Sequence, residues 1–471
     1  MPQLPWLDDA CSLVDAYRRR ELSPLEALDA CVAAIEASEL NAISHTDFDR
    51  AREQAAEADV TLPFGGVPVA VKELDRVKGW PYNHASLVFD GDVSEFDHTV
   101  IERLRAAGAV LPVQTTASEF GGINCTTTRL HGSTSSPWMA GRTPGGSSGG
   151  TAASVSGGLV PLGTGGDGGG SIRIPAGFCG LFGLKPNFGR VPKGPATDFG
   201  PLTAVIGCLS RSVRDTARYL DVTNGYDTHD PQSLPRVEGY EAGLGSLDLA
   251  GLRATVLPDL GGAARVRGDV VEIVEESAAA LIAATGMRRV DAGLDLPGGS
   301  MEWALANMTS LIVELEGRYP ECEPELTPEI MLGLNVASHQ YDLRMAGSVE
   351  AFRRRVHEAM AELFDQADVI FAATNPDVAF NAAGPMPSVV DGVDLVSELG
   401  FERGLLNNGA LTIPSNLAWN PAASVPAGML DGLPVGLQLI AAHHREPLLL
   451  DLALAFERER PWPKVAPAAP C

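Results

Sequence analysis

Gly163-Thr-Gly-Gly-Asp-Gly-Gly-Gly-Ser171-Ile-Arg-Ile-Pro175 is the stretch of this 471-residue chain that carries the most information. Three adjacent glycines precede Ser171, so no side chain covers the backbone N–H groups there. Such N–H groups can hold the oxygen of a tetrahedral intermediate while a serine hydroxyl attacks a carbonyl carbon. If Ser171 also opens a helix, the helix dipole strengthens that anion site. The stretch therefore indicates a serine nucleophile beside an anion-binding loop.

Two segments upstream supply what such a serine needs. Gly145-Gly-Ser-Ser-Gly-Gly150 carries a pair of serines, and Val67-Pro-Val-Ala-Val-Lys72 ends an apolar run with a lysine. A serine hydroxyl is activated by a base, and burial lowers the pKa of a lysine toward neutrality. Together the three segments can form a serine nucleophile with a lysine base and no histidine. The alternative for Lys72 is a surface lysine paired with Glu73 or Asp75.

Other interpretations of the glycines remain open. Gly163-x-Gly165-x-x-Gly168 matches a dinucleotide-binding fingerprint, but no acidic residue follows about 20 positions on. Gly145-Gly-Ser147-Ser-Gly149 matches a nucleophile elbow, which would make Ser147 the nucleophile and require a downstream histidine. A phosphate loop of the GxxxxGK[ST] type is absent. A flexible linker does not fit, because Leu159-Val-Pro-Leu162 interrupts the glycines with an apolar, strand-like run.

Composition excludes several classes of protein. The chain is 45% hydrophobic and 20% charged with a net charge of -25, which argues against binding nucleic acid or an anionic membrane. Seven scattered cysteines without a CxxC or Cys/His cluster predict reduced thiols, with neither a disulfide framework nor a metal site. No signal peptide and no apolar run of about 18 residues is present. We expect a cytoplasmic protein without a cofactor.

Periodicity predicts an α/β fold. Two helices are expected within residues 5–36, the second opened by the capping box Ser23-Pro-Leu-Glu26. Further helical patterns cover Asp97–Ala107 and Ser212–Val222. Between the helices lie short apolar runs that predict strands at Val67–Val71, Ala109–Val113, Leu159–Leu162, Ala254–Leu257, Val369–Ala372 and Leu433–Ile440. Strands alternating with helices predict a sheet covered on both faces.

The chain is interpreted as a single domain over residues 1–471. Within it we expect N-terminal helices at 1–60, a catalytic core at 65–200 and a helical insertion at 300–366 that lines the pocket. The Pro- and Ala-rich tail at 461–471 is expected to fray.

Several motifs, in order, resemble the amidase signature family. They are Gly66-Val-Pro-Val-Ala-Val-Lys-Glu73, Gly145–Gly150, Asp167-Gly-Gly-Gly-Ser-Ile-Arg-Ile-Pro-Ala176, Phe178-Cys-Gly-Leu-Phe-Gly-Leu-Lys-Pro186, Asp227-Thr-His-Asp-Pro231, Asn416-Leu-Ala-Trp-Asn-Pro421, Ser424-Val-Pro-Ala-Gly428 and Asp431-Gly-Leu-Pro-Val-Gly-Leu-Gln438. The resemblance covers nearly the whole chain. It implies one α/β/α domain around a large mixed sheet, and no metal or cofactor.

The resemblance also implies a Ser–cis-Ser–Lys triad. Ser171 would be the nucleophile, and Ser147, held by a cis peptide after Gly146, would relay the proton. Lys72 would be the general base and later the source of the leaving group's proton. Ser148 would orient Lys72.

The loop before the nucleophile has implied roles as well. Gly168, Gly169 and Gly170 would form the oxyanion hole, and Asp167 and Arg173 would brace it. The reaction implied is hydrolysis of an amide, ester or carbamate through an acyl-enzyme on Ser171. Dimers are common in the resembling family, so a homodimer is a further expectation.

The sequence indicates less clearly to which subgroup of this family the chain is most similar. A glutaminase subunit of a tRNA-dependent amidotransferase usually carries Gln where this chain has Ile174, and Tyr-Gly-Arg-Val-Ser where it has Phe188-Gly-Arg-Val-Pro192. Both departures favour a stand-alone hydrolase. A fatty-acid-amide enzyme usually adds an apolar membrane-binding helix, which we do not find. An inactive binding paralogue is the non-enzyme alternative.

Candidate pocket residues favour an uncharged substrate, because none is an evident receptor for a carboxylate or an ammonium group. Aryl amides are the first expectation and carbamates (urethanes) the second, with nylon-type oligomers and small aliphatic amides after them. The candidate wall residues are Trp419, Ile123, Phe120, Trp138 and Met386.

Overall fold

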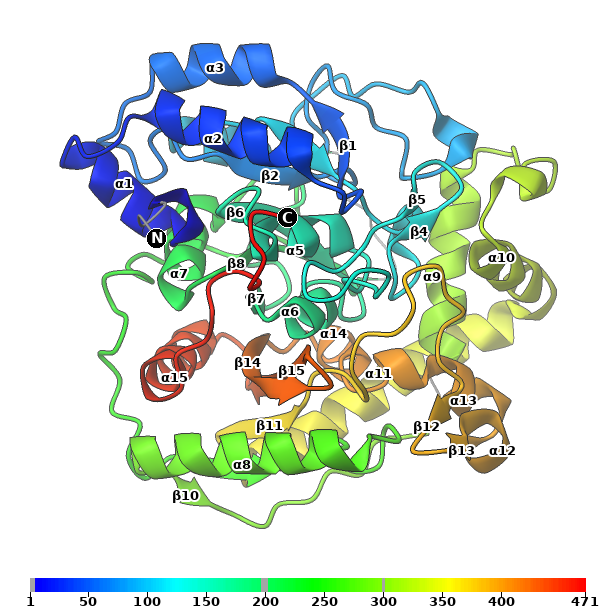
Figure 1. The fold of residues 1–471 in the computed structure, drawn as a ribbon. Coiled ribbons are helices and arrows are strands. Elements are labelled where there is room, and N and C mark those ends of the chain that lie inside the picture. Colours follow the sequence, from blue (N-terminus) through cyan, green and yellow to red (C-terminus); the bar gives the residue numbers. More distant parts are fainter. Residues whose placement is uncertain (1–4, 196–201, 299–300) are drawn as a thin grey trace.

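The computed structural model describes residues 5–195, 202–298 and 301–471. The parts of the predicted segments that fall on residues 1–4, 196–200 and 300 therefore lie outside the described residues. Within the described ranges, a mixed sheet of eleven strands runs through the molecule (Figure 1). Its spatial order is β1 (Ile43–Thr46), β3 (Val113–Thr115), β2 (Val69–Lys72), β6 (Leu162–Asp167), β8 (Val205–Ser210), β7 (Phe182–Lys185), β14 (Ala422–Leu430), β15 (Leu433–Ala441), β11 (Val369–Ala373), β9 (Arg253–Val256) and β10 (Arg288–Arg289).

Both faces of the sheet are covered, as the apolar runs predict. Successive strand residues point to opposite faces, and in β2 the alternation separates two apolar clusters. Val69 and Val71 belong to a cluster with α7 (Val213–Thr223), α8 (Gly268–Thr285) and α15 (Glu446–Glu459). Ala70 packs on the other face against α5 (Gly149–Ser156) and α6 (Arg173–Cys179).

The other helices surround this core. They are α1 (Ala10–Arg18), α2 (Pro24–Ala37), α3 (Phe48–Ala56), α4 (Thr99–Ala106), α9 (Met301–Glu314), α10 (Pro328–Gln340), α11 (Leu343–Phe364), α12 (Leu395–Leu399), α13 (Phe401–Leu406) and α14 (Ile413–Leu417). Two small hairpins pair β4 (Thr127–Thr128) with β5 (Gly132–Ser133) and β12 (Val389–Val390) with β13 (Val393–Asp394). No helix of the described ranges combines the length and apolar character needed to cross a membrane.

Local sequence signals place several of these elements correctly. The capping box is present at the start of α2, where Ser23 accepts from the Glu26 N–H and Glu26 accepts from the Ser23 N–H. Ser212 caps α7 in the same way, by accepting from the Asp215 N–H. Since each cap satisfies a backbone N–H that has no partner inside the helix, the short polar side chain fixes where the helix begins.

The strand leading to Ser171 begins later than the apolar pattern predicts. The expected strand at Leu159–Leu162 is instead β6, which starts at Leu162 and continues through the glycines to Asp167. These glycines permit close packing, because a Cβ on Gly163 would lie 2.5 Å from the Thr151 methyl group in α5. Strands β7, β8 and β14 were not predicted from the pattern.

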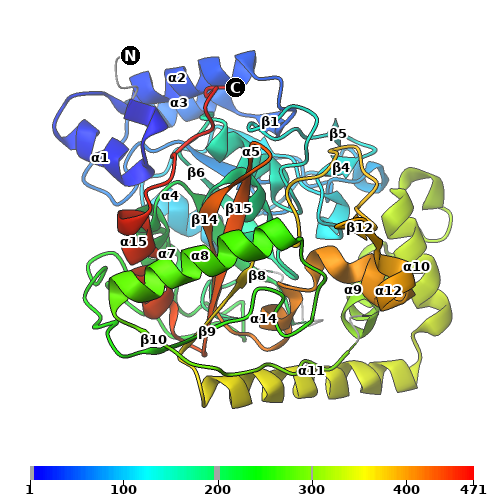
Figure 2. The same cartoon turned by 60° about the horizontal axis from the view of Figure 1, so that its bottom comes forward.

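The first part of the helical insertion, α9 and α10, packs against the core through a separate apolar cluster, whereas Phe352 and Met360 of α11 belong to the main core cluster. Leu311, Ile330 and Leu334 gather with Phe89, and Phe120 packs on the same cluster. Figure 1 shows α9 and α10, in yellow-green, beyond β4 and β5, and Figure 2 shows α11 along the lower edge of the molecule.

The C-terminal tail differs from the prediction that residues 461–471 fray. Trp462 and Ala466 are buried, and the Trp462 indole N–H donates to the Arg211 carbonyl. The N–H groups of Ala466 and Cys471 donate to the carbonyls of Ser156, the last residue of α5, and of Gly157, which follows it, at 2.8 and 3.0 Å. The Pro/Ala composition does not prevent order here, because these backbone groups have partners and the apolar side chains are covered.

Candidate active site

Lys72 is the last residue of β2, and its side chain is buried at 2% exposure. Its Nζ donates to the Ser147 Oγ at 2.7 Å and to the Ser148 Oγ at 3.0 Å. Burial lowers the pKa of Lys72 to about 8, against the opposing attraction of Asp75, Asp167 and Glu73. A lysine in this state can accept a proton near neutral pH.

Ser147 and Ser148 lie directly before α5 and face Lys72. The peptide bond between Gly146 and Ser147 is cis. Only glycine fits at the two positions before Ser147. A Cβ on Gly146 would lie 2.7 Å from the Cys125 nitrogen, and one on Gly145 would lie 2.8 Å from the Pro175 Cα. The Gly-Gly-Ser-Ser run therefore passes close to neighbouring backbone and delivers both hydroxyls to the lysine.

Ser171 follows β6 and lines the same cavity as Lys72 and Ser147. Among the described residues, its hydroxyl has no hydrogen-bond partner, and Ser171 is buried at 8% exposure. It stands two positions before the first residue of α6, at Arg173, so it lies just ahead of that helix.

The glycine loop differs from the prediction at Gly170. The Gly170 N–H already donates to Asp167 Oδ1 at 2.7 Å, so it is not offered to a substrate oxygen. In the described part of the chain, the N–H groups of Gly168, Gly169 and Ser171 have no acceptor. A donor set of these three groups fits the geometry better than three glycines.

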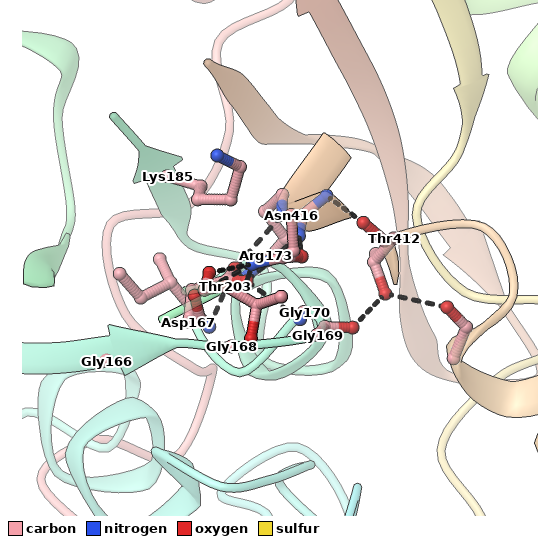
Figure 3. Close-up of polar contacts among 12 residues, drawn as sticks. Gly166, Asp167, Gly168, Gly169, Gly170, Arg173, Lys185, Thr203, Thr412 and Asn416 are labelled. Carbon is pink, nitrogen blue, oxygen red and sulfur yellow. Dashed lines mark hydrogen bonds and ion pairs between the residues drawn. The ribbon is translucent and has the colours of Figure 1, made fainter. Parts of the chain in front are cut away.

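A buried ion pair braces the loop (Figure 3). Arg173 and Asp167 are both fully buried and lie 2.9 Å apart. Burial disfavours the Asp167 carboxylate, yet Arg173 and further polar partners hold its pKa far below the usual range. Arg173 also donates to Asn416 Oδ1, Gln438 Oε1 and the Thr412 carbonyl.

Asn416, Gln438 and Thr412 were not predicted as site residues. The first two stand in motifs that resemble the family, but no local pattern indicates that residues 243 and 265 positions from Arg173 share one network with it. Asn416 also donates to the Asp167 carbonyl at 2.8 Å. The network satisfies most of the polar groups around a buried charge, as a buried ion pair requires.

A cavity of about 620 Å³ opens over these groups. Three of the predicted wall residues, Phe120, Ile123 and Met386, line it. The insertion contributes apolar lining that residue-level prediction missed, including Trp303, Met308 and Leu311 of α9 and Ile330 of α10. Charged side chains line it as well, among them Arg76, Asp75 and Glu314. The Glu314 carboxylate lies 3.0 Å from the His84 ring nitrogen.

Trp138 and Trp419 do not line this cavity, contrary to the prediction. The Trp138 indole donates to the Ser156 hydroxyl and the Cys179 carbonyl, between the ends of α5 and α6. Trp419 stacks on Phe188 with ring centroids 4.9 Å apart. Both large rings are therefore engaged in packing outside the cavity.

Fold and site together define a class of protein: a mixed α/β sheet that buries a lysine–serine pair beside a glycine-rich loop. The chain belongs to the amidase family, whose model, described as Amidase, matches residues 26–450. This confirms the resemblance to the amidase signature family and the α/β fold class.

Relatives and solved structures agree with this assignment. The chain is 32% identical to an acylamidase of Rhodococcus erythropolis, with 99% of this chain and 98% of the relative covered. It is 33% identical to a glutamyl-tRNA(Gln) amidotransferase subunit of Roseiflexus, with 97% of each covered. A bacterial aryl acylamidase structure matches with a TM-score of 0.88 at 26% identity over 97% of each chain. A 6-aminohexanoate cyclic dimer hydrolase complexed with substrate matches with a TM-score of 0.88 at 29% identity, covering 99% of this chain and 100% of that one.

Proposed function

We propose that this amide-hydrolysing enzyme is a stand-alone amidase that cleaves uncharged amides, aryl amides foremost, through an acyl-enzyme on Ser171. The observation that carries the proposal is the buried Lys72 Nζ within 2.7 Å of the Ser147 Oγ, in the cavity that Ser171 also lines. The apolar side chains that the insertion adds to the cavity support a substrate with an aromatic or aliphatic body.

In the proposed reaction, the Ser171 Oγ bonds to the amide carbon while its proton passes to Ser147, whose own proton passes to Lys72. The substrate oxygen becomes an oxyanion held by the free N–H groups of the glycine loop. The C–N bond then breaks, and the leaving nitrogen takes its proton from Lys72 through Ser147. Water repeats these steps on the acyl-enzyme and releases the acid. Ester and carbamate (urethane) hydrolysis would follow the same route, because only the atoms next to the carbonyl carbon differ.

The glutaminase component of an amidotransferase is the second candidate, favoured by the 33% identity to the Roseiflexus protein. Against it stand Ile174 and Pro192, where this chain departs from the pattern of those glutaminases. The two candidates differ in what the isolated chain does. A stand-alone amidase turns over an acyl anilide without partner proteins, whereas a glutaminase component prefers glutamine.

The test is covalent labelling with a fluorophosphonate or aryl-carbamate probe, followed by peptide mass spectrometry. We expect the adduct on Ser171, its loss in Ser171→Ala and its suppression in Lys72→Ala. An adduct on Ser147 would instead indicate the elbow-type mechanism. The absence of both label and anilide turnover would favour an inactive binding paralogue.

A further inference from the structure

The glycine loop is held by its carbonyl groups, one peptide at a time. The Gly168 carbonyl accepts from the Trp303 indole Nε1 at 3.2 Å. The Gly169 carbonyl accepts from the Thr412 Oγ1 at 2.6 Å, and the Gly170 carbonyl accepts from the Ile174 N–H at 2.7 Å. In a trans peptide the C=O and the following N–H point in opposite directions. Each carbonyl anchor therefore also fixes the direction of the next residue's N–H.

Only the first of these anchors comes from the helical insertion. Thr412 and Ile174 are buried in the core around the site, whereas Trp303 lies in the first turn of α9. The peptide that Trp303 holds carries the N–H of Gly169, one of the three N–H groups of this loop for which the described residues provide no acceptor. The direction of that N–H thus depends on where α9 sits.

Trp303 and Gly169 are also in van der Waals contact. A Cβ on Gly169 would lie 2.5 Å from the Trp303 Cζ2 and 3.0 Å from its Cη2, so the indole ring lies directly against the Gly169 Cα. Both residues line the cavity. The indole thus contacts the loop through its N–H and through its ring, at the wall of the cavity.

We propose that Trp303 is a positioning residue: it holds the Gly168–Gly169 peptide so that the Gly169 N–H is directed at the substrate oxygen. The position of α9 then affects how well the oxyanion is stabilised. This inference rests on the proposed function. It predicts that loss of the indole N–H weakens binding of the tetrahedral state more than binding of the substrate, because the oxyanion forms only in the former.

The test compares Trp303→Phe, which keeps a ring but removes the donor, with Trp138→Phe as the matched control. The control also removes an indole N–H donor, but from a ring outside the cavity. The measurements are kcat and KM for an acyl anilide and the Ki of phenylboronic acid, whose boron bonds to a serine Oγ and becomes tetrahedral. Thermal midpoints report whether either variant is misfolded.

We expect Trp303→Phe to lower kcat and to weaken the boronate Ki by a common factor of roughly 10, with KM changed less than about twofold. Trp138→Phe should leave all three values near wild type. Unchanged kcat and Ki in Trp303→Phe, or an effect on KM alone, would overturn the inference while leaving the proposed function standing. A wild-type protein that neither hydrolyses the anilide nor binds the boronate would overturn the proposed function and this inference with it.

Discussion

At the scale of the residue, the protonation of Lys72 sets the expected pH dependence. Burial brings the pKa of Lys72 to about 8, and only the neutral amine can accept the proton from Ser147. We therefore expect kcat/KM to rise about tenfold per pH unit below pH 8 and to level off above it. The check is a pH–rate profile with an anilide. A profile that is flat between pH 6 and 9 would contradict Lys72 as the base.

A substitution at Asp75 provides a second test of Lys72 as the general base. Its carboxylate is the main attraction that offsets the burial of Lys72, and Thr164 bridges the two residues by donating to Asp75 and accepting from the Lys72 N–H. Asp75→Asn keeps an oxygen that can accept from Thr164 but removes the charge. The pKa of Lys72 should fall, and the rising limb of the profile should move to lower pH. A shift to higher pH would show that Asp75 does not act through charge.

The buried ion pair makes a prediction about stability. Arg173→Met would leave Asp167 charged, buried and without its cation, so we expect the free energy of unfolding to fall by about 3–5 kcal/mol. Arg52→Met is the matched control, because Arg52 pairs with Asp29 at the surface and both side chains are about half exposed. That pair should contribute at most about 1 kcal/mol. Chemical denaturation of both variants measures the difference, and equal losses would contradict the role of the buried pair.

At the scale of the element, glycine positions decide how closely α5 approaches the sheet. A Cβ on Gly150 would lie 2.5 Å from the Thr116 nitrogen, and backbone cannot yield as a flexible side chain can. Gly150→Ala should therefore displace the start of α5 together with Ser147 and Ser148. We expect activity to fall at least about 100-fold, since a shift of about 1 Å at a catalytic group has that effect.

Gly347→Ala is the control for this substitution. Gly347 lies within α11, and a Cβ there would meet no atom within 4 Å. The added methyl group should stabilise the helix by roughly 0.5–1 kcal/mol and leave activity unchanged. Anilide turnover and thermal midpoints of the two variants provide the measurement. Similar behaviour of both would contradict the close approach of α5.

Elements with local signals could be predicted from the sequence, and those without could not. The capping box places the start of α2 because its partners are three residues apart. By contrast, β6 runs through glycines, whose lack of side chains hides any strand pattern, and β14 contains Pro426. The motifs brought Lys72, Ser147 and Ser171 to one site in the prediction. The contacts of Arg173 with Asn416, Gln438 and Thr412 were not predicted, because these residues meet only once distant strands and helices have assembled.

At the scale of the whole molecule, the cavity exists only where the insertion meets the core. Lys72 and Ser171 lie on adjacent parallel strands or just beyond them, whereas Met308 and Ile330 approach from helices more than 130 positions later in the chain. The helices α9 and α10 are joined to the core by the apolar cluster that includes Phe89 and Leu311, and α11 is joined to it by the main core cluster. The proposed reacting groups therefore come from the core, and much of the surface that an aryl group would contact in the proposed function comes from the insertion.

Because the insertion supplies much of the apolar lining of the cavity, we expect its residues to affect kcat/KM for aryl substrates more than for small aliphatic ones. An aromatic ring that buries about 100 Å² of apolar surface in the cavity gains about 2.5 kcal/mol, so an acyl anilide should exceed a small aliphatic amide in kcat/KM by roughly 50-fold. Met308→Ala should remove part of that gain by raising KM for the anilide several-fold, with little effect on the aliphatic amide. Leu343→Ala is the control, because Leu343 is 93% exposed at the start of α11. The measurement is kcat and KM for both substrates with the wild-type protein, Met308→Ala and Leu343→Ala. An equal loss on both substrates would place Met308 outside the path of the ring, and the aryl preference would then have to arise from the core alone.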